Sequence, residues 1–283
     1  DGDRALPTLL SRLEKGQSLE GIPNIALTSA GAETRELVED LDNLPFVFRE
    51  GFYEVAPYYK ECGLRSFLTS RGCPYFCTYC FNHAFNKMFK GCGKILRKRS
   101  VENLISEIEY VIQKYPPVKL IRFGDDTFAH TADEWLKEFS EKYASRIKLP
   151  FYCLMRSNTL TEETASLLSR AGCQSIAMSI ESGVQRVRQD ILKRNISDEL
   201  CIESFDIARK YGINVIGATM IGIPGSTLDE DFKSLEFTRK IRPAAPNFPI
   251  LTPYPGTEIW KYAVDSNLMD KEADVYVSAH DLS

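Results

Sequence analysis

The sequence Ser-Arg-Gly-Cys-Pro-Tyr-Phe-Cys-Thr-Tyr-Cys, residues 70–80, brings three cysteines into one short loop, and the rest of the chain is organised around it. The spacing of Cys73, Cys77 and Cys80 allows three thiolates on one side of the loop, and Gly72 and Pro74 favour the tight turns required. Structural zinc takes four ligands, as do ordinary iron–sulfur ferredoxins. Three cysteines therefore leave one iron of a cubane cluster with an open coordination position.

This motif, with Tyr79 directly before its last cysteine, resembles the signature of the radical S-adenosylmethionine (SAM) superfamily. The resemblance implies a [4Fe-4S] cluster on Cys73, Cys77 and Cys80, whose open iron chelates the amino and carboxylate groups of SAM. It implies that Tyr79 lies near the adenine. In that family the reduced cluster cleaves SAM, and a 5′-deoxyadenosyl radical abstracts hydrogen from a small-molecule substrate. An electron donor such as flavodoxin or ferredoxin is then expected as a partner.

A zinc site or a disulfide cluster is the alternative interpretation of the motif. His83, three residues after Cys80, is the obvious fourth zinc ligand, but zinc signatures usually pair two short-spaced dyads. Cys62 and Cys92 flank the motif at spacings that match no ligand pattern. The remaining cysteines are scattered singly in apolar runs, where cysteine usually acts as a small buried hydrophobe.

The composition is that of an ordinary globular protein. The 283 residues are 43% hydrophobic and 26% charged, enough to bury one large core or two modest ones. The net charge of -4 gives no indication of binding to nucleic acid or an anionic membrane. We expect no membrane span, because no apolar run approaches the roughly 18–20 residues needed. Free thiols favour a reducing interior, so a cytoplasmic location is predicted.

From residue 64 onward the pattern alternates between strand and helix. Six strands apolar on both faces, separated by helices, require a parallel sheet covered by helices. Eight such units do not fit this length, so we predict an α/β fold with an open, partial (β/α)6 barrel of the TIM type. The strands are expected at 65–69, 118–123, 151–155, 175–180, 214–221 and 247–251. Helices are expected after caps at Ser100 and Thr131, and over 161–170, 198–211 and 227–241.

The first 63 residues combine a helical pattern over 5–15, a strand-like segment over 22–27 and an aromatic-rich linker. They resemble the segment that joins a Rossmann-like cobalamin-binding domain to the barrel in cobalamin-dependent radical SAM enzymes. We therefore interpret residues 1–63 as a linker or the remnant of a cobalamin-binding domain, with a plain N-terminal extension as the alternative. Residues 64–262 form the barrel and 263–283 a C-terminal tail. The chain lacks an initiating methionine, and we expect it to be a piece of a longer protein.

In such a barrel the working residues lie at the carboxyl ends of the strands. Gly124, Asp125 and Asp126 follow the second strand, where a glycine allows close backbone approach and acids accept hydrogen bonds from an ammonium group. They resemble the family's Gly-Gly-Glu-type motif, which holds the amino group of SAM, but the sequence is Gly-Asp-Asp. Backbone contacts are therefore favoured over either carboxylate. A solvated turn is the alternative.

Further candidates follow the later strands. Arg156 closes the third strand, either paired with a local carboxylate or directed at an anion in the pocket. Glu181 lies in a Gly-x-Glu-Ser-like motif, which implies contacts to the ribose or ammonium of SAM. Arg194 resembles an arginine that reaches the SAM carboxylate, with an exposed surface charge as the alternative. Gly222 lies in a loop expected under the adenine.

Two short segments refine the resemblance. Residues 81–85, before a basic run at 94–99, match the branch with radical methyltransferases and anaerobic oxidative cyclases. The basic run itself is more typical of a solvated face than of an anion site. The prediction is a radical SAM enzyme that uses the cluster, SAM and cobalamin for methyl transfer or oxidative cyclisation. The alternatives are a cobalamin-independent radical SAM enzyme (methylthiolation or rearrangement) and a non-catalytic iron-sulfur or zinc module. The substrate is not predicted.

Overall fold

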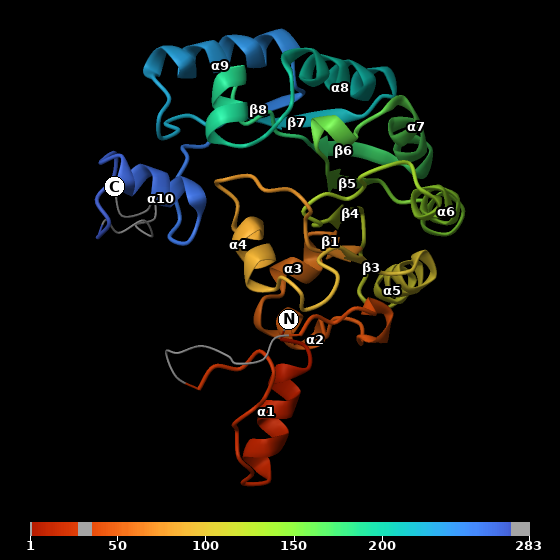
Figure 1. Ribbon diagram of the computed structural model, residues 1–283. Coiled ribbons are helices and arrows are strands. Elements are labelled where there is room, and N and C mark those ends of the chain that lie inside the picture. The colour runs from red at the N-terminus through yellow and green to blue at the C-terminus, as the bar shows by residue number, and fades with distance from the viewer. Residues whose placement is uncertain (1, 28–35, 273–283) are drawn as a thin grey trace.

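The computed structural model describes residues 2–27 and 36–272 and confirms the predicted partial barrel. One sheet contains six parallel strands in the order β1-β4-β5-β6-β7-β8, so β1 and β8 are its edges (Figure 1). Residues 273–283 of the predicted C-terminal tail lie outside the described residues. The strands are β1 (Leu64–Phe67), β4 (Leu120–Phe123), β5 (Phe151–Leu154), β6 (Cys173–Ala177), β7 (Asn214–Ala218) and β8 (Ala245–Asn247).

Helices cover the outer face of this sheet and build the core with it (Figure 1). Strand β4 shows the pattern: Ile121 and Phe123 are fully buried against the helices, whereas Arg122 between them is exposed. The strands thus alternate in burial. The prediction that they are apolar on both faces is wrong, because the inner face of an open barrel remains accessible. The covering helices are α5 (Val101–Lys114), α6 (Glu134–Lys142), α7 (Glu162–Ala171), α8 (Asp198–Lys210) and α9 (Leu228–Ile241).

Most helix ends follow the sequence signals. Ser100 caps α5, and Thr161 caps α7, which ends at Gly172 with φ +97°. Thr227 and Glu230 form a reciprocal capping box at the start of α9. The expected cap at Thr131 is wrong, because the Asp133 carboxylate accepts the hydrogen bond from Leu136 N–H at 2.9 Å and begins α6.

Two predicted strands differ from the structure. No strand forms at 22–27, because Asn24 has φ +63° and its side-chain amide bonds both backbone groups of Glu36. The last strand is Ala245–Asn247, not 247–251. Pro246 is tolerated there because β8 is an edge strand. Beyond it, Ile250 makes only an isolated bridge to Ile221.

Several short elements were not predicted. Strands β2 (Ser70–Arg71) and β3 (Arg97–Lys98) form an antiparallel pair, and α4 (Phe81–Met88) follows the cysteine loop. The others are η1 (Leu41–Asn43), α2 (Glu50–Val55), α3 (Tyr58–Glu61), η2 (Tyr143–Ile147), η3 (Ser157–Thr159), η4 (Val187–Ile191) and α10 (Glu258–Asp265).

The first and last helices lie at the periphery (Figure 1). The predicted first helix is α1 (Ala5–Glu14), which extends away from the sheet (Figure 1). Helix α10 (Glu258–Asp265) crosses residue 262, the predicted end of the barrel. Across the described residues, every helix is too short or too polar to cross a bilayer.

Candidate active site at the strand ends

The three cysteines of the motif line one cavity of about 180 Å³, the cysteine cavity. It lies where the sequence predicted the site, beside residues that follow β4, β5 and β6. Five of the eight predicted cofactor-binding residues line it with the cysteines: Tyr79, Asp126, Arg156, Glu181 and Arg194.

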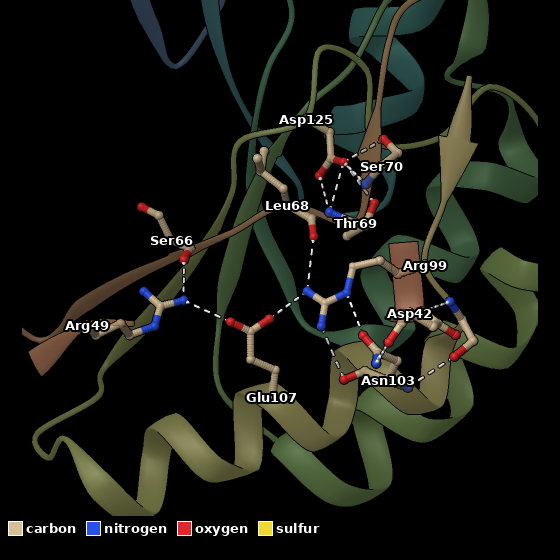
Figure 2. Close-up of polar contacts among 11 residues, drawn as sticks. Asp42, Arg49, Ser66, Leu68, Thr69, Ser70, Arg99, Asn103, Glu107 and Asp125 are labelled. Atoms are coloured by element: carbon tan, nitrogen blue, oxygen red, sulfur yellow. Dashed lines mark hydrogen bonds and ion pairs between the residues drawn. The ribbon is translucent and has the colours of Figure 1, made fainter. Parts of the chain in front are cut away.

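Asp125 holds the entry to the cysteine loop (Figure 2). Its buried carboxylate accepts hydrogen bonds from the backbone N–H and hydroxyl groups of Thr69 and Ser70, at 2.6–3.2 Å. Burial raises the pKa of Asp125, and the hydrogen bonds from Ser70 and Thr69 oppose that rise. The carboxylate thus binds backbone and hydroxyl groups of the protein itself.

Gly72 continues this support where the loop leaves strand β2. It has φ +88°, and a Cβ there would lie 2.2 Å from the carbonyl oxygen of Ile95. Only glycine permits both the backbone conformation and this close approach to the chain preceding β3. The β2–β3 pair therefore fixes the path of the chain into Cys73.

The middle and the end of the loop are tied to distant parts of the chain. Thr78 donates its N–H to Leu192 O at 3.2 Å and its hydroxyl to Ile191 O at 2.8 Å. The Thr78 carbonyl accepts from Ile259 N–H of α10 at 3.0 Å. Asn86 of α4 donates its amide to Cys73 O at 2.9 Å. The cysteines are thus held by segments that only the complete fold brings together.

The donor set fits a cluster better than a single ion. Among residues 2–27 and 36–272, no three His, Cys, Asp or Glu side chains are arranged to hold one metal ion. A cubane needs no such convergence, because each thiolate binds a different iron. His83, the candidate fourth zinc ligand, instead has Nδ1 2.7 Å from Cys80 O. Burial raises the pKa of the Cys73 and Cys80 thiols, so binding of a metal cluster would have to offset their protonation.

A buried polar network forms another wall of the cysteine cavity. The Tyr79 hydroxyl donates to Glu181 Oε1 at 2.8 Å, and Arg194 Nη1 lies 3.3 Å from the same oxygen. Arg194 Nη2 also donates to Ser179 O at 2.6 Å. Arg194 is 4% exposed, so the predicted alternative of a surface charge does not hold. Its Nε is buried and makes no hydrogen bond within the described residues.

Burial and charge act together in this network. Burial raises the pKa of Tyr79 well above its ordinary value, and the neighbouring Glu181 carboxylate raises it further. Burial lowers the pKa of Arg194, but the nearby Glu181 carboxylate, with smaller contributions from Tyr79 and Cys77, outweighs the effect of burial, and the net shift is upward. At neutral pH the network therefore contains a neutral phenol and a guanidinium cation. A buried donor without a partner beside a carboxylate suits a ligand with both an anionic and a cationic group, such as an amino acid.

The backbone at Glu181 is strained in a way that positions its side chain. Glu181 has φ +67°, which is uncommon for a residue with a side chain and costs about 1–3 kcal/mol. The conformation is held by a bridge to Thr219 and by Met220 N–H, which donates to Glu181 O at 2.8 Å. Two residues on, Gly183 packs so closely on α9 that a Cβ would lie 2.6 Å from the Cα of Ser234. Such strain at a cavity wall is typical of functional sites.

Three predicted residues lie outside the cysteine cavity. Gly124 and Asp125 line a neighbouring space of about 310 Å³, the middle cavity, which shares Asn82 and Asp126 with the cysteine cavity. Gly222 lines neither cavity, and its N–H donates to Asp231 Oδ2 at 3.0 Å. Roles for these three residues in SAM binding stay predictions.

Sequence reasoning missed several residues around the site. Asn82, Thr127 and Ser179 line the cysteine cavity, and Tyr75 and Asn158 contact Arg156. The positions of two of them in the sequence were a weak indication of a role in the site. Tyr75 lies inside the cysteine motif, and Ser179 lies in the segment that contains Glu181. The prediction of a solvated basic run at 94–99 is wrong for Arg97, which is 4% exposed and donates to Val38 O at 2.9 Å.

A third space, the arginine cavity, adjoins the middle cavity at the edge strand β1. It measures about 350 Å³ and shares Leu68, Ser70, Arg71 and Gly124 with the middle cavity. Buried Glu107 bridges Arg49, at 3.3 Å, and Arg99, at 2.5 Å (Figure 2). These arginines also donate to Ser66 O and Leu68 O, which covers the exposed edge of β1. Four arginines line the space: Arg49, Arg71, Arg99 and Arg122.

A family model matches the part of the chain that contains this site. The model of the radical SAM superfamily matches residues 67–237. An uncharacterized methyltransferase of Pyrococcus horikoshii is 29% identical over 95% of this chain and 58% of its own length. Cytidylyl-2-hydroxyethylphosphonate methyltransferase of Streptomyces wedmorensis is 24% identical over 88% of this chain and 48% of its own length. The chain thus spans about half the length of the curated relatives it matches.

Solved structures share the fold. The radical SAM methyltransferase TsrM of Kitasatospora setae, solved with tryptophan substrate and a SAM analog, aligns with a TM-score of 0.73 at 18% identity. That alignment covers 96% of this chain and 56% of TsrM. The cobalamin-dependent SAM radical enzyme OxsB aligns with a TM-score of 0.69 at 22% identity, over 96% of this chain and 39% of OxsB.

Proposed function

The chain belongs to the radical SAM superfamily, and we propose that it is the catalytic barrel of a cobalamin-dependent radical SAM methyltransferase. The observation that carries the proposal is the shared cavity. Three cysteines, for which the described residues offer no fourth metal ligand, and a buried Glu181–Arg194 pair line the same space. The names of the relatives favour methyl transfer over oxidative cyclisation as the outcome.

The protein's own residues would hold and orient the cofactors. Cys73, Cys77 and Cys80 would bind a [4Fe-4S] cluster, which together with SAM supplies the radical that abstracts hydrogen. Arg194 would bind the carboxylate of SAM through its buried Nε, and Glu181 would accept from the ammonium or ribose of SAM. The Tyr79 hydroxyl keeps Glu181 in place, and its ring lines the space proposed for the adenine.

Cobalamin would bind outside the described barrel. We propose that residues 1–63 connect the barrel to a cobalamin-binding domain, as OxsB and TsrM, both solved with cobalamin, share the fold over most of this chain. Helix α1 supports this role, since it extends from the barrel with Leu6, Leu10 and Leu13 more than half exposed (Figure 1). Apolar side chains at this spacing form one helix face suited to contact with another domain.

We place the methyl acceptor in the middle and arginine cavities. They adjoin the cysteine cavity, and their combined lining of apolar and guanidinium groups favours an acceptor with an apolar body and an anionic group. Arg122 makes no ion pair within the described residues, so Arg122→Gln tests this placement without breaking a buried pair. The variant should weaken acceptor binding and leave cleavage of SAM in the absence of acceptor unchanged.

The decisive experiment uses the full-length gene product, reconstituted anaerobically with iron, sulfide and cobalamin. Under reductant it should cleave SAM to 5′-deoxyadenosine, and Cys77→Ser should abolish this. Bound cobalamin at about one per chain is expected by absorbance. A reconstituted protein that holds the cluster but forms no 5′-deoxyadenosine would refute the enzymatic proposal. Cleavage without any cobalamin binding would refute only the assignment to the cobalamin-dependent branch.

A further inference from the structure

Arg156 contacts one of the cysteines directly, which neither alternative from the sequence anticipated. Its Nη1 donates to Cys77 Sγ at 3.3 Å, and its Nε donates to Asn158 Oδ1 at 3.1 Å. The guanidinium carbon lies 3.7 Å from the centre of the Tyr75 ring. Tyr75 itself belongs to the cysteine loop, between Cys73 and Cys77. The guanidinium is therefore fixed between an aromatic face and a sulfur atom.

The backbone of Arg156 is also fixed. Thr159 donates both its N–H and its hydroxyl to Arg156 O at 2.9 Å, and Arg156 N–H donates back to Thr159 Oγ1 at 3.3 Å. The Asn158 amide in turn lies 3.5 Å from the Tyr75 hydroxyl. Arg156, Asn158 and Tyr75 thus form a closed arrangement in which Arg156 is only 8% exposed.

The charge environment of Arg156 differs from that of Arg194. Within the described chain it forms no ion pair with a carboxylate, in contrast to Arg194, which is 3.3 Å from Glu181. A partly desolvated cation against sulfur has a larger electrostatic effect than one in water. In the apoprotein this charge lies against a single sulfur.

We propose that Arg156 raises the reduction potential of the cluster by donating a charge-assisted hydrogen bond to the Cys77 sulfur. This inference rests on the proposed function for the presence of the cluster. Reduction transfers one electron from a low-potential donor to the cluster and moves no proton to or from Arg156. The added negative charge is stabilised by a cation held at the sulfur, so the reduced state gains more than the oxidised state. Tyr75 and Asn158 are positioning residues, because they hold the guanidinium in place.

The test measures the midpoint potential of the reconstituted protein by redox titration monitored by electron paramagnetic resonance, in the absence of SAM. Arg156→Gln should move the potential to more negative values while iron and sulfide per chain stay at the wild-type level. Arg156→Lys keeps the charge but loses the stacked, two-donor geometry, so an intermediate shift is expected. Arg186→Gln is the matched control, because it removes an arginine that is paired with Glu230 and does not line the cysteine cavity. Its potential should equal that of the wild type.

A second variant tests the inference if Arg156→Gln assembles the cluster poorly. Asn158→Ala removes only the partner of Nε and should shift the potential in the same direction by a smaller amount. An unchanged midpoint potential in Arg156→Gln that holds the cluster would overturn the inference. If Arg156→Gln does not assemble a cluster, an unchanged potential in Asn158→Ala would overturn it. A loss of SAM affinity without a shift in potential would also overturn it, because Arg156 would then act in SAM binding. A wild-type protein that never assembles a cluster would refute the proposed function rather than this step.

Discussion

The loops after β4 and β6 each bring a buried acid to the strand ends but use it for different purposes. Asp125, after β4, accepts hydrogen bonds from Thr69 and Ser70 and supports the cysteine loop from behind. Glu181, after β6, lines the cysteine cavity and faces Arg194 and Tyr79. One side of the site is thus a structural support, and the other is a polar surface for a ligand.

The difference shows that an acid at a strand end has no fixed role. Asp125 accepts its hydrogen bonds from donors of the neighbouring segment 69–70, so its carboxylate serves to hold the fold. Glu181 shares one oxygen with two donors and adopts a strained backbone conformation beside the cavity. Variants on the support side should therefore affect loading of the cluster, and variants on the ligand side should affect SAM affinity.

The largest effect is expected for Asp125→Ala. This substitution leaves several hydrogen-bond donors of Thr69 and Ser70 buried without an acceptor. Each donor that water cannot reach destabilises the fold by about 1–3 kcal/mol. Iron content after reconstitution should fall severely, and the free energy of unfolding should fall by about 3 kcal/mol or more. Asp126→Ala is the control, since its exposed side chain lines the cavities. Equal iron loss in both variants would contradict the division into two sides.

Gly72→Ala should rank second. The added Cβ collides with Ile95 O, and the backbone also has a positive φ. Gly91 has φ +80° and open space around its Cα, so Gly91→Ala carries the conformational cost of about 1 kcal/mol without the collision. Iron content should therefore fall in the first variant and persist in the second. Retention of iron by Gly72→Ala would show that the β2–β3 pair is dispensable for the loop.

On the ligand side, Tyr79→Phe should leave iron content unchanged and weaken binding of SAM. The phenol hydroxyl donates to Glu181 and accepts from Arg194 at 3.2 Å, so its loss costs about 1 kcal/mol of positioning, or several-fold in affinity. Anaerobic calorimetry on the reconstituted protein measures this. Tyr58→Phe, at a residue 72% exposed, is the control. A loss of iron in Tyr79→Phe would place Tyr79 on the support side.

The smallest effect concerns the surface of the support side, where Asp3 pairs with Arg71 of β2. The hydrogen bond from Arg71 lowers the pKa of Asp3, so this pair stabilises the fold fully above the ordinary value of 3.8. The stabilisation is lost as the pH falls through the lowered pKa. Asp3→Asn should reduce the free energy of unfolding at neutral pH by at most about 1 kcal/mol and remove this part of the acid dependence. A larger loss, measured by chemical denaturation, would show that the N-terminal segment is integral to the support.

The sequence predicted the barrel well because its signals are local and repeated. The cap at Ser100, the glycine at the end of the 161–170 helix and periodic apolar positions mark each unit independently of its neighbours. The cysteines lie in one short motif and Glu181 lies in a segment that follows a strand, whereas Arg194 was predicted from its resemblance to a family arginine.

The remaining features depend on contacts between distant residues. Nothing in Gly-Asp-Asp indicates that the first aspartate turns toward residues 69–70 and the second toward the cavity. The contact of Arg156 with Cys77 joins residues 79 positions apart, and the burial of Arg97 depends on Val38. Such pairings follow from how the barrel brings strand ends together, which a local pattern does not encode.

The hydrogen bond from Ile259 to Thr78 has a consequence for biosynthesis. Because α10 is translated about 180 residues after the cysteine motif, the contact between Ile259 and Thr78 forms only after α10 has been synthesised. Iron–sulfur maturation would then follow translation rather than accompany it. A chain ending before residue 257 should accordingly show less iron uptake than the intact one, even though all three thiols are present.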